Sequence, residues 1–488
     1  MITSRISEWA RSNPAKTAAI YNKFQLSYAD FSGLIEGTRR FLEQQALPPG
    51  KTAIVFSKNT LNSWILITAL RATGLNTIAI QAPAQAPELK IKDVACVVVL
   101  QSEPLGHELN SPAFAGLKLV KVAITRPAGG QASVPLQRSE APFGGHIIYS
   151  SGTTGTYKKI MVDGAVEDQR NDARSRAYSF DSQTVYHTLD FGMWTTVGFK
   201  NPSAVWHAGG CVVFDQNPDK FRNFFRHDIT AALMVPAQLQ ELLQVTDASG
   251  PPRAGLELIV TAGFLPLALA EAAVRQLTNK VSLSYGSSEL GSPLMRSHFR
   301  TSDDLHWFTP VGDRTIQIVD EDGHECATDQ EGELRIRPLD IDCRSYLDDD
   351  DTSLQVFRDG FFHPGDMAIR RADGRVRILG RTADVLNVLG NKIAAAPLED
   401  ALQYELRVDE VCLFSRLDDT GKEELVIAIQ SDHELSASQL ETAARKVPVF
   451  KNVRFSVWKE FPRTETGMKK TRRAVLRKLV FAGKTQAN

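Results

Sequence analysis

The amino-acid sequence predicts an α/β fold. The predicted fold comprises a large amino-terminal domain of mainly parallel sheets flanked by helices, a small β-barrel-like part, and a small α+β carboxyl-terminal domain. Short β-rich runs alternate with helical patterns through most of the chain, as expected for βαβ units with parallel sheets. From about residue 312, Asp-Gly turns separate alternating strands, which indicates antiparallel hairpins. The chain has 488 residues, more than one hydrophobic core usually holds, so two or more domains are expected.

The parallel part is predicted from runs rich in β-branched residues. A helical pattern at 61–72 lies between two such runs, and Gly- or Pro-containing segments bound several of them. The segment 127–142 is rich in Gly, Ala, Ser and Pro and predicts a surface connection. The predicted strands lie at 52–56, 77–80, 95–100, 146–148, 211–214, 231–236, 258–261 and 280–284.

The β-barrel-like part and the small domain follow. Asp-Gly turns at 322–323 and 373–374 predict hairpins that use strands at 316–319, 367–370 and 375–379. A boundary near residue 382 divides the chain into predicted domains 1–381 and 382–488. Within the second domain we expect a hairpin at 385–393, helices at 397–406 and 436–446, and a strand pair around Cys412 and 425–429.

Composition limits the class of protein. Lys and Arg number 56 against 57 Asp and Glu, so the formal charge of −1 gives no global reason to expect nucleic acid as a partner. The five cysteines lack CxxC spacing, which argues against a zinc site or a disulfide framework and suits the cytoplasm. No apolar run resembles a signal peptide or a membrane span, so we expect an unexported protein.

A loop rich in hydroxyls and glycine follows the strand predicted at 146–148. Glycines let the backbone fold closely around an anion, while amides, hydroxyls and a lysine bind phosphate oxygens. Gly152 and Gly155 are too close for the GxxxxGK[ST] loop of P-loop NTPases. A plain surface loop is the alternative interpretation. The residues predicted to bind a polyphosphate are Ser150, Ser151, Gly152, Thr153, Thr154, Gly155 and Lys158.

Four further motifs follow in order. They are Tyr285-Gly286-Ser287-Ser288-Glu289, then Phe362-His363-Pro364-Gly365-Asp366, then a segment from Arg381 to Gly390, and finally a basic run that contains Lys469 and Lys470. Alone, each also suits a capped turn, a surface arginine or a solvated tail. In their common order, the five motifs resemble those of the ANL superfamily of adenylating enzymes, which includes acyl- and aryl-CoA ligases and peptide-synthetase adenylation domains.

The resemblance implies roles at the nucleotide. Tyr285 would stack on adenine, Ser288 would bond a phosphate, and Glu289 would hold a magnesium ion. Asp366 would accept hydrogen bonds from both ribose hydroxyls, and Arg381 would contact ribose or phosphate. Gly263 and Gly286 complete the implied nucleotide site. The resemblance also implies that the small carboxyl-terminal domain is mobile and rotates to present the hairpin around Gly390 to CoA.

A catalytic lysine is implied near the carboxyl end. In the family it bridges the substrate carboxylate and the α-phosphate directly after a glycine, but here Met468 follows Gly467. Counting back from Leu476 favours Lys470, and counting forward from Gly467 favours Lys469.

The loops depart from the family in three other places. Tyr157 replaces proline, Lys159 replaces glycine, and Ala383 replaces the acidic or basic hinge residue.

The implied activity is ATP-dependent conversion of a carboxylic acid to an acyl-adenylate, followed by transfer to the thiol of CoA. ATP, Mg²⁺ and CoA are the implied cofactors, and a small carboxylic acid is the implied substrate. A free-standing amino-acid or aryl-acid adenylation enzyme that loads a carrier protein is the alternative, because Asp190 lies in a segment that resembles the ammonium-binding segment of peptide synthetases. An aspartate that is buried or caps a helix is the structural alternative for Asp190. A third alternative is an inactive relative that only binds ligands. The presence of Tyr285, Glu289, Asp366 and Arg381 argues against it. The residues implied to line the acid pocket are Asp190, Phe191, Trp194, Phe264 and Ser287.

Overall fold

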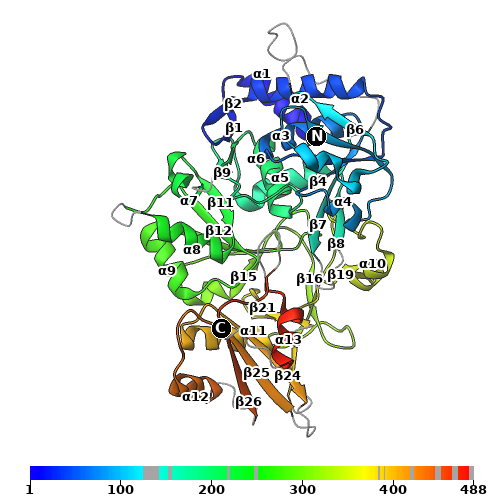
Figure 1. The fold of residues 1–488 in the computed structure, drawn as a ribbon. Helices are drawn as coiled ribbons and strands as arrows, with labels where there is room; N and C mark the ends of the chain where they lie inside the picture. Colours follow the sequence, from blue (N-terminus) through cyan, green and yellow to red (C-terminus); the bar gives the residue numbers. More distant parts are fainter. Residues whose placement is uncertain are drawn as a thin grey trace.

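The computed structural model describes residues 1–124, 142–151, 157–216, 220–246, 251–382, 385–388, 391–417, 423–445, 452–463 and 471–482. Figure 1 shows a large part, coloured blue to yellow, and a smaller part at the carboxyl end, coloured orange and red. Among the described residues, no helix is both long and apolar enough to cross a membrane.

The first sheet confirms the predicted parallel arrangement. Its strands pair in the order β6-β5-β3-β4-β7-β8, and all neighbours are parallel except β7 and β8. The predicted strand at 52–56 is β3, and β4 and β5 each begin one residue before the prediction. The bounds are β3 (Thr52–Phe56), β4 (Asn76–Ile80), β5 (Val94–Leu100), β6 (Leu119–Val122), β7 (His146–Ser151) and β8 (Tyr157–Val162).

The second sheet begins with six parallel strands in the order β13-β12-β11-β9-β10-β1, and β2 closes its edge antiparallel to β1. The predicted strand at 231–236 ends earlier than expected, because Pro236 begins a helix instead. The bounds are β1 (Thr17–Tyr21), β2 (Phe24–Ser27), β9 (Val185–His187), β10 (Cys211–Phe214), β11 (Ala231–Met234), β12 (Glu257–Thr261) and β13 (Lys280–Tyr285).

The predicted β-barrel-like part is antiparallel, but it is not a separate sheet. Strand β14 pairs with both β13 and β15, and β15 pairs with β21, so the antiparallel strands continue the second sheet directly. The hairpin predicted around 373–374 is present as β20 and β21. The bounds are β14 (Met295–His298), β15 (Trp307–Pro310), β16 (Ile316–Val319), β17 (Glu331–Ile336), β18 (Phe357–Arg358), β19 (Phe361–Phe362), β20 (Asp366–Arg370) and β21 (Val376–Arg381).

Helices of the two parallel sheets meet in one hydrophobic core. Trp64 on α3 lies edge-on to Trp206 of α6, with ring centroids 4.9 Å apart, and stacks on Phe199 at 5.0 Å. This packing holds β7, which lies between β4 and β8 in the first sheet, beside α6 of the second. The helices of the large part are α1 (Ile2–Ser12), α2 (Tyr28–Glu43), α3 (Thr60–Ala72), α4 (Gln85–Glu88), α5 (Glu167–Tyr178), α6 (Thr196–His207), α7 (Lys220–Asn223), α8 (Pro236–Val245), α9 (Leu267–Gln276) and α10 (Asp350–Val356).

The carboxyl-terminal part forms sheets and cores of its own. Strand β25 alternates between two of these cores: Leu425 and Ile427 pack in one, whereas Val426 and Ala428 pack in the other with Trp458. The boundary proposed near residue 382 falls between β21 and β22. The bounds are β22 (Val385–Val388), β23 (Asn391–Ala394), α11 (Ala395–Leu406), β24 (Glu410–Leu417), β25 (Glu423–Gln430), α12 (Ala437–Arg445), β26 (Val453–Trp458) and α13 (Arg473–Phe481).

Candidate active site

The predicted phosphate loop connects two strands that extend further than expected. Strand β7 runs to Ser151 and β8 starts at Tyr157, with Ser150 opposite Lys158 in the antiparallel register. Residues 149–151 and 157–159 therefore belong to a hairpin, where the sequence predicted a continuous loop. Ladder hydrogen bonds outweigh the loop-like composition at these positions. Gly152, Thr153, Thr154 and Gly155 lie outside the described residues, as do the side chains of Ser150 and Ser151.

The two lysines at the start of β8 have different environments, as expected for neighbours on a strand. The ammonium of Lys158 lies 5.1 Å from the centre of the Tyr346 ring. The buried Lys159 instead binds the Asp348 carboxylate at 3.2 Å and the main-chain oxygen of Lys90 at 3.1 Å. Lys158 is thus the lysine that faces the aromatic side chain, whereas Lys159 anchors the strand.

Glu289 lies in the turn after β13, and two hydroxyls bind its carboxylate. The Tyr346 hydroxyl donates to Oε1 at 2.5 Å, and the Ser287 hydroxyl donates to Oε2. Burial, followed by the charge of Glu289, raises the pKa of Tyr346, so this phenol keeps its proton and remains a donor. Ser287, which was predicted to line the acid pocket, therefore supports Glu289. The Ser288 hydroxyl accepts a hydrogen bond from Thr196 at 2.8 Å.

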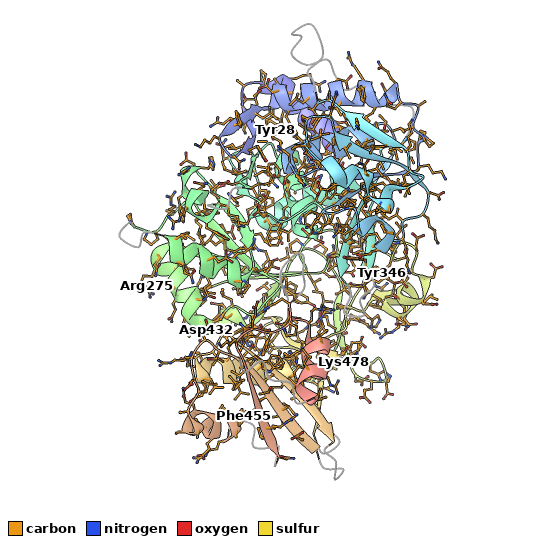
Figure 2. All side chains as sticks on the ribbon, viewed as in Figure 1. Tyr28, Arg275, Tyr346, Asp432, Phe455 and Lys478 are labelled. Carbon is orange, nitrogen blue, oxygen red and sulfur yellow. The ribbon has the colours of Figure 1, made fainter. Side chains whose placement is uncertain are left out.

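Tyr346 was not identified from the sequence. It lies in the irregular segment before α10, where its amide donates to Ser353 at 2.8 Å, and Figure 2 labels it. The next amide, that of Leu347, donates to the main-chain oxygen of Lys159 at 2.8 Å and so ties this segment to β8. No local sequence pattern marks such a tyrosine, because its partners Lys158 and Glu289 are far away in the chain.

A second cluster joins three predicted nucleotide residues. The Tyr285 hydroxyl donates to Asp366 Oδ2, and Arg381 Nε lies 3.2 Å from Asp366 Oδ1. The β20–β21 register places Asp366 directly opposite Arg381. Arg381 also donates to the main-chain oxygen of Pro364 at 2.6 Å. Burial, followed by the Asp366 charge, holds the pKa of Tyr285 well above its usual value.

Asp190 is neither buried nor a helix cap. It is exposed with φ +60°, and its Oδ2 lies 2.7 Å from the ammonium of Lys220. The N-cap of α6 is Thr195, which accepts from the Gly198 amide at 3.0 Å. The capping interpretation of Asp190 is therefore wrong.

The remaining pocket and turn residues are spread over several elements. Phe191 is buried, and Trp194 covers Gly192, where an added Cβ would lie 2.0 Å from the indole. Phe264 stacks on His306 with a centroid distance of 5.3 Å. Gly263 and Gly286 are exposed at the ends of β12 and β13. Lys469, Lys470 and Gly390 lie outside the described residues.

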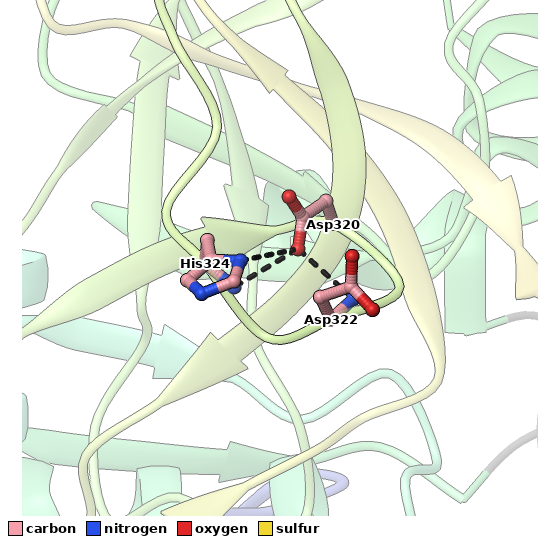
Figure 3. Close-up of side chains that lie close together, drawn as sticks. All are labelled: Asp320, Asp322 and His324. Carbon is pink, nitrogen blue, oxygen red and sulfur yellow. Dashed lines mark hydrogen bonds and ion pairs between the residues drawn. The ribbon is translucent and has the colours of Figure 1, made fainter.

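The turn after β16 contains a separate group of possible metal ligands, Asp320, Asp322 and His324 (Figure 3). The Asp320 carboxylate accepts from the amides of Asp322 at 3.0 Å and His324 at 2.9 Å. These bonds form an ordinary Asp-stabilised turn. The group was not predicted, and the turn accounts for its geometry without a metal.

Known proteins are similar in sequence to this chain over most of its length. The chain is 25% identical to indoleacetate–CoA ligase of Aromatoleum aromaticum, over 97% of this chain and 98% of that protein. It is 23% identical to tyrocidine synthase 1 of Brevibacillus parabrevis, over 91% of this chain but only 42% of that longer protein.

Solved structures share the fold. The anthranilate CoA ligase AuaEII, in complex with anthranoyl-AMP, superposes with a TM-score of 0.80 at 17% identity, covering 99% of this chain and 98% of that one. The amide bond synthetase McbA from Marinactinospora thermotolerans also gives 0.80, at 18% identity, covering 98% and 99%. The sequence profile described as AMP-binding enzyme matches residues 6–339, more than half of the chain. The protein therefore belongs to the family of AMP-binding enzymes.

Proposed function

We propose that this protein activates a carboxylic acid with ATP and then transfers the acyl group to the thiol of CoA. The observation that carries the proposal is the convergence of separate motifs into two clusters joined by one turn. Tyr285 bonds to Asp366, which also pairs with Arg381. Four residues after Tyr285, Glu289 bonds to Tyr346, whose ring lies beside Lys158. Both clusters lie beyond the carboxyl end of the parallel strand β13, the usual place for ligands in α/β sheets.

The first cluster suits a nucleoside. Asp366 would accept hydrogen bonds from the ribose hydroxyls, since the two oxygens of a carboxylate together offer about four acceptor sites. The exposed guanidinium of Arg381 would reach ribose or phosphate, and the ring of Tyr285 would contact adenine.

The second cluster suits the phosphates. Lys158 and the loop of Ser150, Ser151, Gly152, Thr153, Thr154 and Gly155 would bind phosphate oxygens. Glu289 is the proposed ligand for Mg²⁺: its carboxylate is held by two hydroxyls, and carboxylate oxygen is the donor that this hard cation prefers. When bound, Mg²⁺ neutralises charge on the phosphates.

In the reaction proposed here, a carboxylate oxygen of the acid bonds to the α-phosphorus of ATP. The bond from that phosphorus to the bridging oxygen breaks, and pyrophosphate leaves. The protein supplies position and positive charge rather than a nucleophile. Lys470 or Lys469 would bridge the acid and the α-phosphate. In the second step the CoA thiolate sulfur bonds to the acyl carbon and AMP leaves, with the hairpin around Gly390 beside the thiol.

CoA is preferred over a carrier protein as acceptor for two reasons. The relative that matches over nearly its full length is named as a CoA ligase, whereas the peptide synthetase is matched over less than half of its length. In addition, Asp190, the residue that suggested an amino-acid substrate, already pairs with Lys220. An acid without an ammonium group therefore fits best. Loading of a carrier protein remains the alternative.

A screen of aryl, short-chain, long-chain and amino acids tests the proposal. With ATP and Mg²⁺, the correct acid should release pyrophosphate and AMP, and mass spectrometry should detect an acyl-CoA thioester once CoA is added. Release of ADP and phosphate would contradict adenylation. Acylation of a carrier protein with CoA inert would contradict the proposed acceptor.

A further inference from the structure

A buried lysine outside the predicted motifs binds the turn that carries Glu289. Lys200 lies on α6 and is 3% exposed. Its ammonium donates to the main-chain oxygens of Ser288 at 2.8 Å and Leu290 at 2.9 Å, the residues on either side of Glu289. Charge-assisted hydrogen bonds of this kind are stronger than neutral ones, so α6 holds the turn directly.

The other carbonyls of the turn are held as well. The Cys343 amide donates to the main-chain oxygen of Glu289 at 2.8 Å, and Arg174 on α5 donates to that of Gly291 at 3.0 Å. On the opposite side, Asp342 accepts from the Gly291 amide at 2.6 Å. Four successive carbonyls, from 288 to 291, thus have partners from α5, α6 and the segment before Tyr346.

The position of Lys200 is unfavourable for a charged group. Burial, followed by the charges of Arg174 and Arg170, lowers the pKa of Lys200 to about 7. An apolar side chain of similar length would avoid this cost and would pack in the same core. Stability alone therefore does not explain why a lysine occupies this position. A role in ordering the turn does explain it.

We propose that Lys200 is a positioning residue for the acid-activation step: by binding the carbonyls of Ser288 and Leu290, it holds the turn so that the Glu289 carboxylate and the Ser288 hydroxyl would be in place to bind Mg²⁺ and the phosphates. This inference rests on the proposed function. Lys200 itself acts through the turn, since its ammonium contacts main-chain oxygens.

The test compares Lys200→Met with Trp206→Phe. Trp206 lies on the same helix, is buried, and donates one hydrogen bond to a main-chain oxygen, that of Ala18, at 2.8 Å. Each substitution thus removes a buried N–H group that donates to main-chain oxygen. Only Lys200→Met removes hydrogen bonds to the turn that carries Glu289. In Lys200→Met we expect faster amide hydrogen exchange at 286–294 and a Mg²⁺ concentration for half-maximal pyrophosphate release raised on the order of 10-fold. The KM for the acid should change little. Trp206→Phe should change neither the exchange nor the Mg²⁺ dependence.

Two outcomes would overturn the inference. In one, Lys200→Met has the same amide exchange at 286–294 and the same Mg²⁺ dependence as the wild type. In the other, Trp206→Phe shows the same changes in both measurements as Lys200→Met. If the wild-type protein releases no pyrophosphate with any acid, the proposed function is wrong, and so is the role of Lys200 in acid activation. Amide hydrogen exchange at 286–294 in Lys200→Met would then still decide whether Lys200 orders the turn.

Discussion

Tyr346 shows how much of this site depends on a single residue. Its hydroxyl binds Glu289, its ring lies beside Lys158, and its neighbour Leu347 bonds to β8. The side chain is 3% exposed, so the hydrogen bond to the carboxylate is shielded from water. A bond of this kind to a charged group contributes about 1.5–3 kcal/mol.

Removing this hydroxyl should weaken the proposed metal site more than the fold. In Tyr346→Phe we expect the Mg²⁺ concentration for half-maximal pyrophosphate release to rise about 10-fold, because groups that orient a ligand carboxylate affect metal affinity by this amount. A Mg²⁺ titration of initial rates measures the change. Tyr28→Phe is the control, since it removes a buried hydroxyl that donates to Gly210 at 2.7 Å on the far side of the large part (Figure 2). Equal Mg²⁺ dependence in the two variants would refute the role of Tyr346.

At the scale of elements, His146 joins β7 to its neighbours. Its Nδ1 lies 2.8 Å from the Thr77 hydroxyl on β4, its Nε2 lies 3.0 Å from the main-chain oxygen of Met193, and its ring stacks on Phe199 of α6 at 4.0 Å. Burial, the main cause, lowers the pKa of His146 to about 3. The strand that leads to the predicted phosphate loop is thus held by a neutral histidine.

This packing predicts an acid-sensitive fold. Between pH 6.5 and 3 the unfolded chain binds a proton at His146 and the folded chain does not, so stability falls as pH decreases through this range. At pH 5 the loss from this residue is about 2 kcal/mol relative to neutral pH. Urea unfolding of the wild type and of His146→Gln at pH 7 and pH 5 measures it, and the variant should lose less stability between the two. The exposed His324→Gln should behave like the wild type. If His146→Gln loses as much stability between pH 7 and pH 5 as the wild type does, the prediction is wrong.

At the scale of the whole molecule, the carboxyl-terminal part packs on the large part next to β21. Gly380 has φ +128°, and an added Cβ would lie 3.1 Å from the Cβ of Ala396 on α11. Glycine is needed both for this backbone conformation and for the close approach of α11. In the sequence, the proposed hinge residue Ala383 follows Gly380 by three positions.

Gly380→Ala should therefore disfavour the observed arrangement of the two parts. We expect a larger radius of gyration by small-angle X-ray scattering and altered relative rates of the adenylation and thioester half-reactions. Gly374→Ala is the matched control, because Gly374 has φ +83° but no neighbouring atom within 4 Å of an added Cβ. Gly374→Ala should introduce backbone strain without changing the radius of gyration. If both variants scatter like the wild type, Gly380 does not govern the packing of the two parts.

Local patterns in the sequence determined much of this protein. β-rich runs of β-branched residues placed strands such as β3 and β10, and Asp-Gly turns placed the β20–β21 hairpin. Residue order also indicated the family, and it singled out Tyr285, Asp366 and Arg381, which the structure brings together. These features depend on neighbours in the chain, so the sequence alone records them.

Contacts between distant residues were decided only by the tertiary structure. Tyr346 reaches Glu289 across 57 positions and Lys200 reaches Ser288 across 88, and neither pair has a local signature. Asp190 resembled an ammonium ligand in its own segment, but the fold brings Lys220 to its carboxylate. Whether a charged side chain is free, paired or buried depends on which elements pack around it. That packing is a property of the whole fold rather than of any one segment of the sequence.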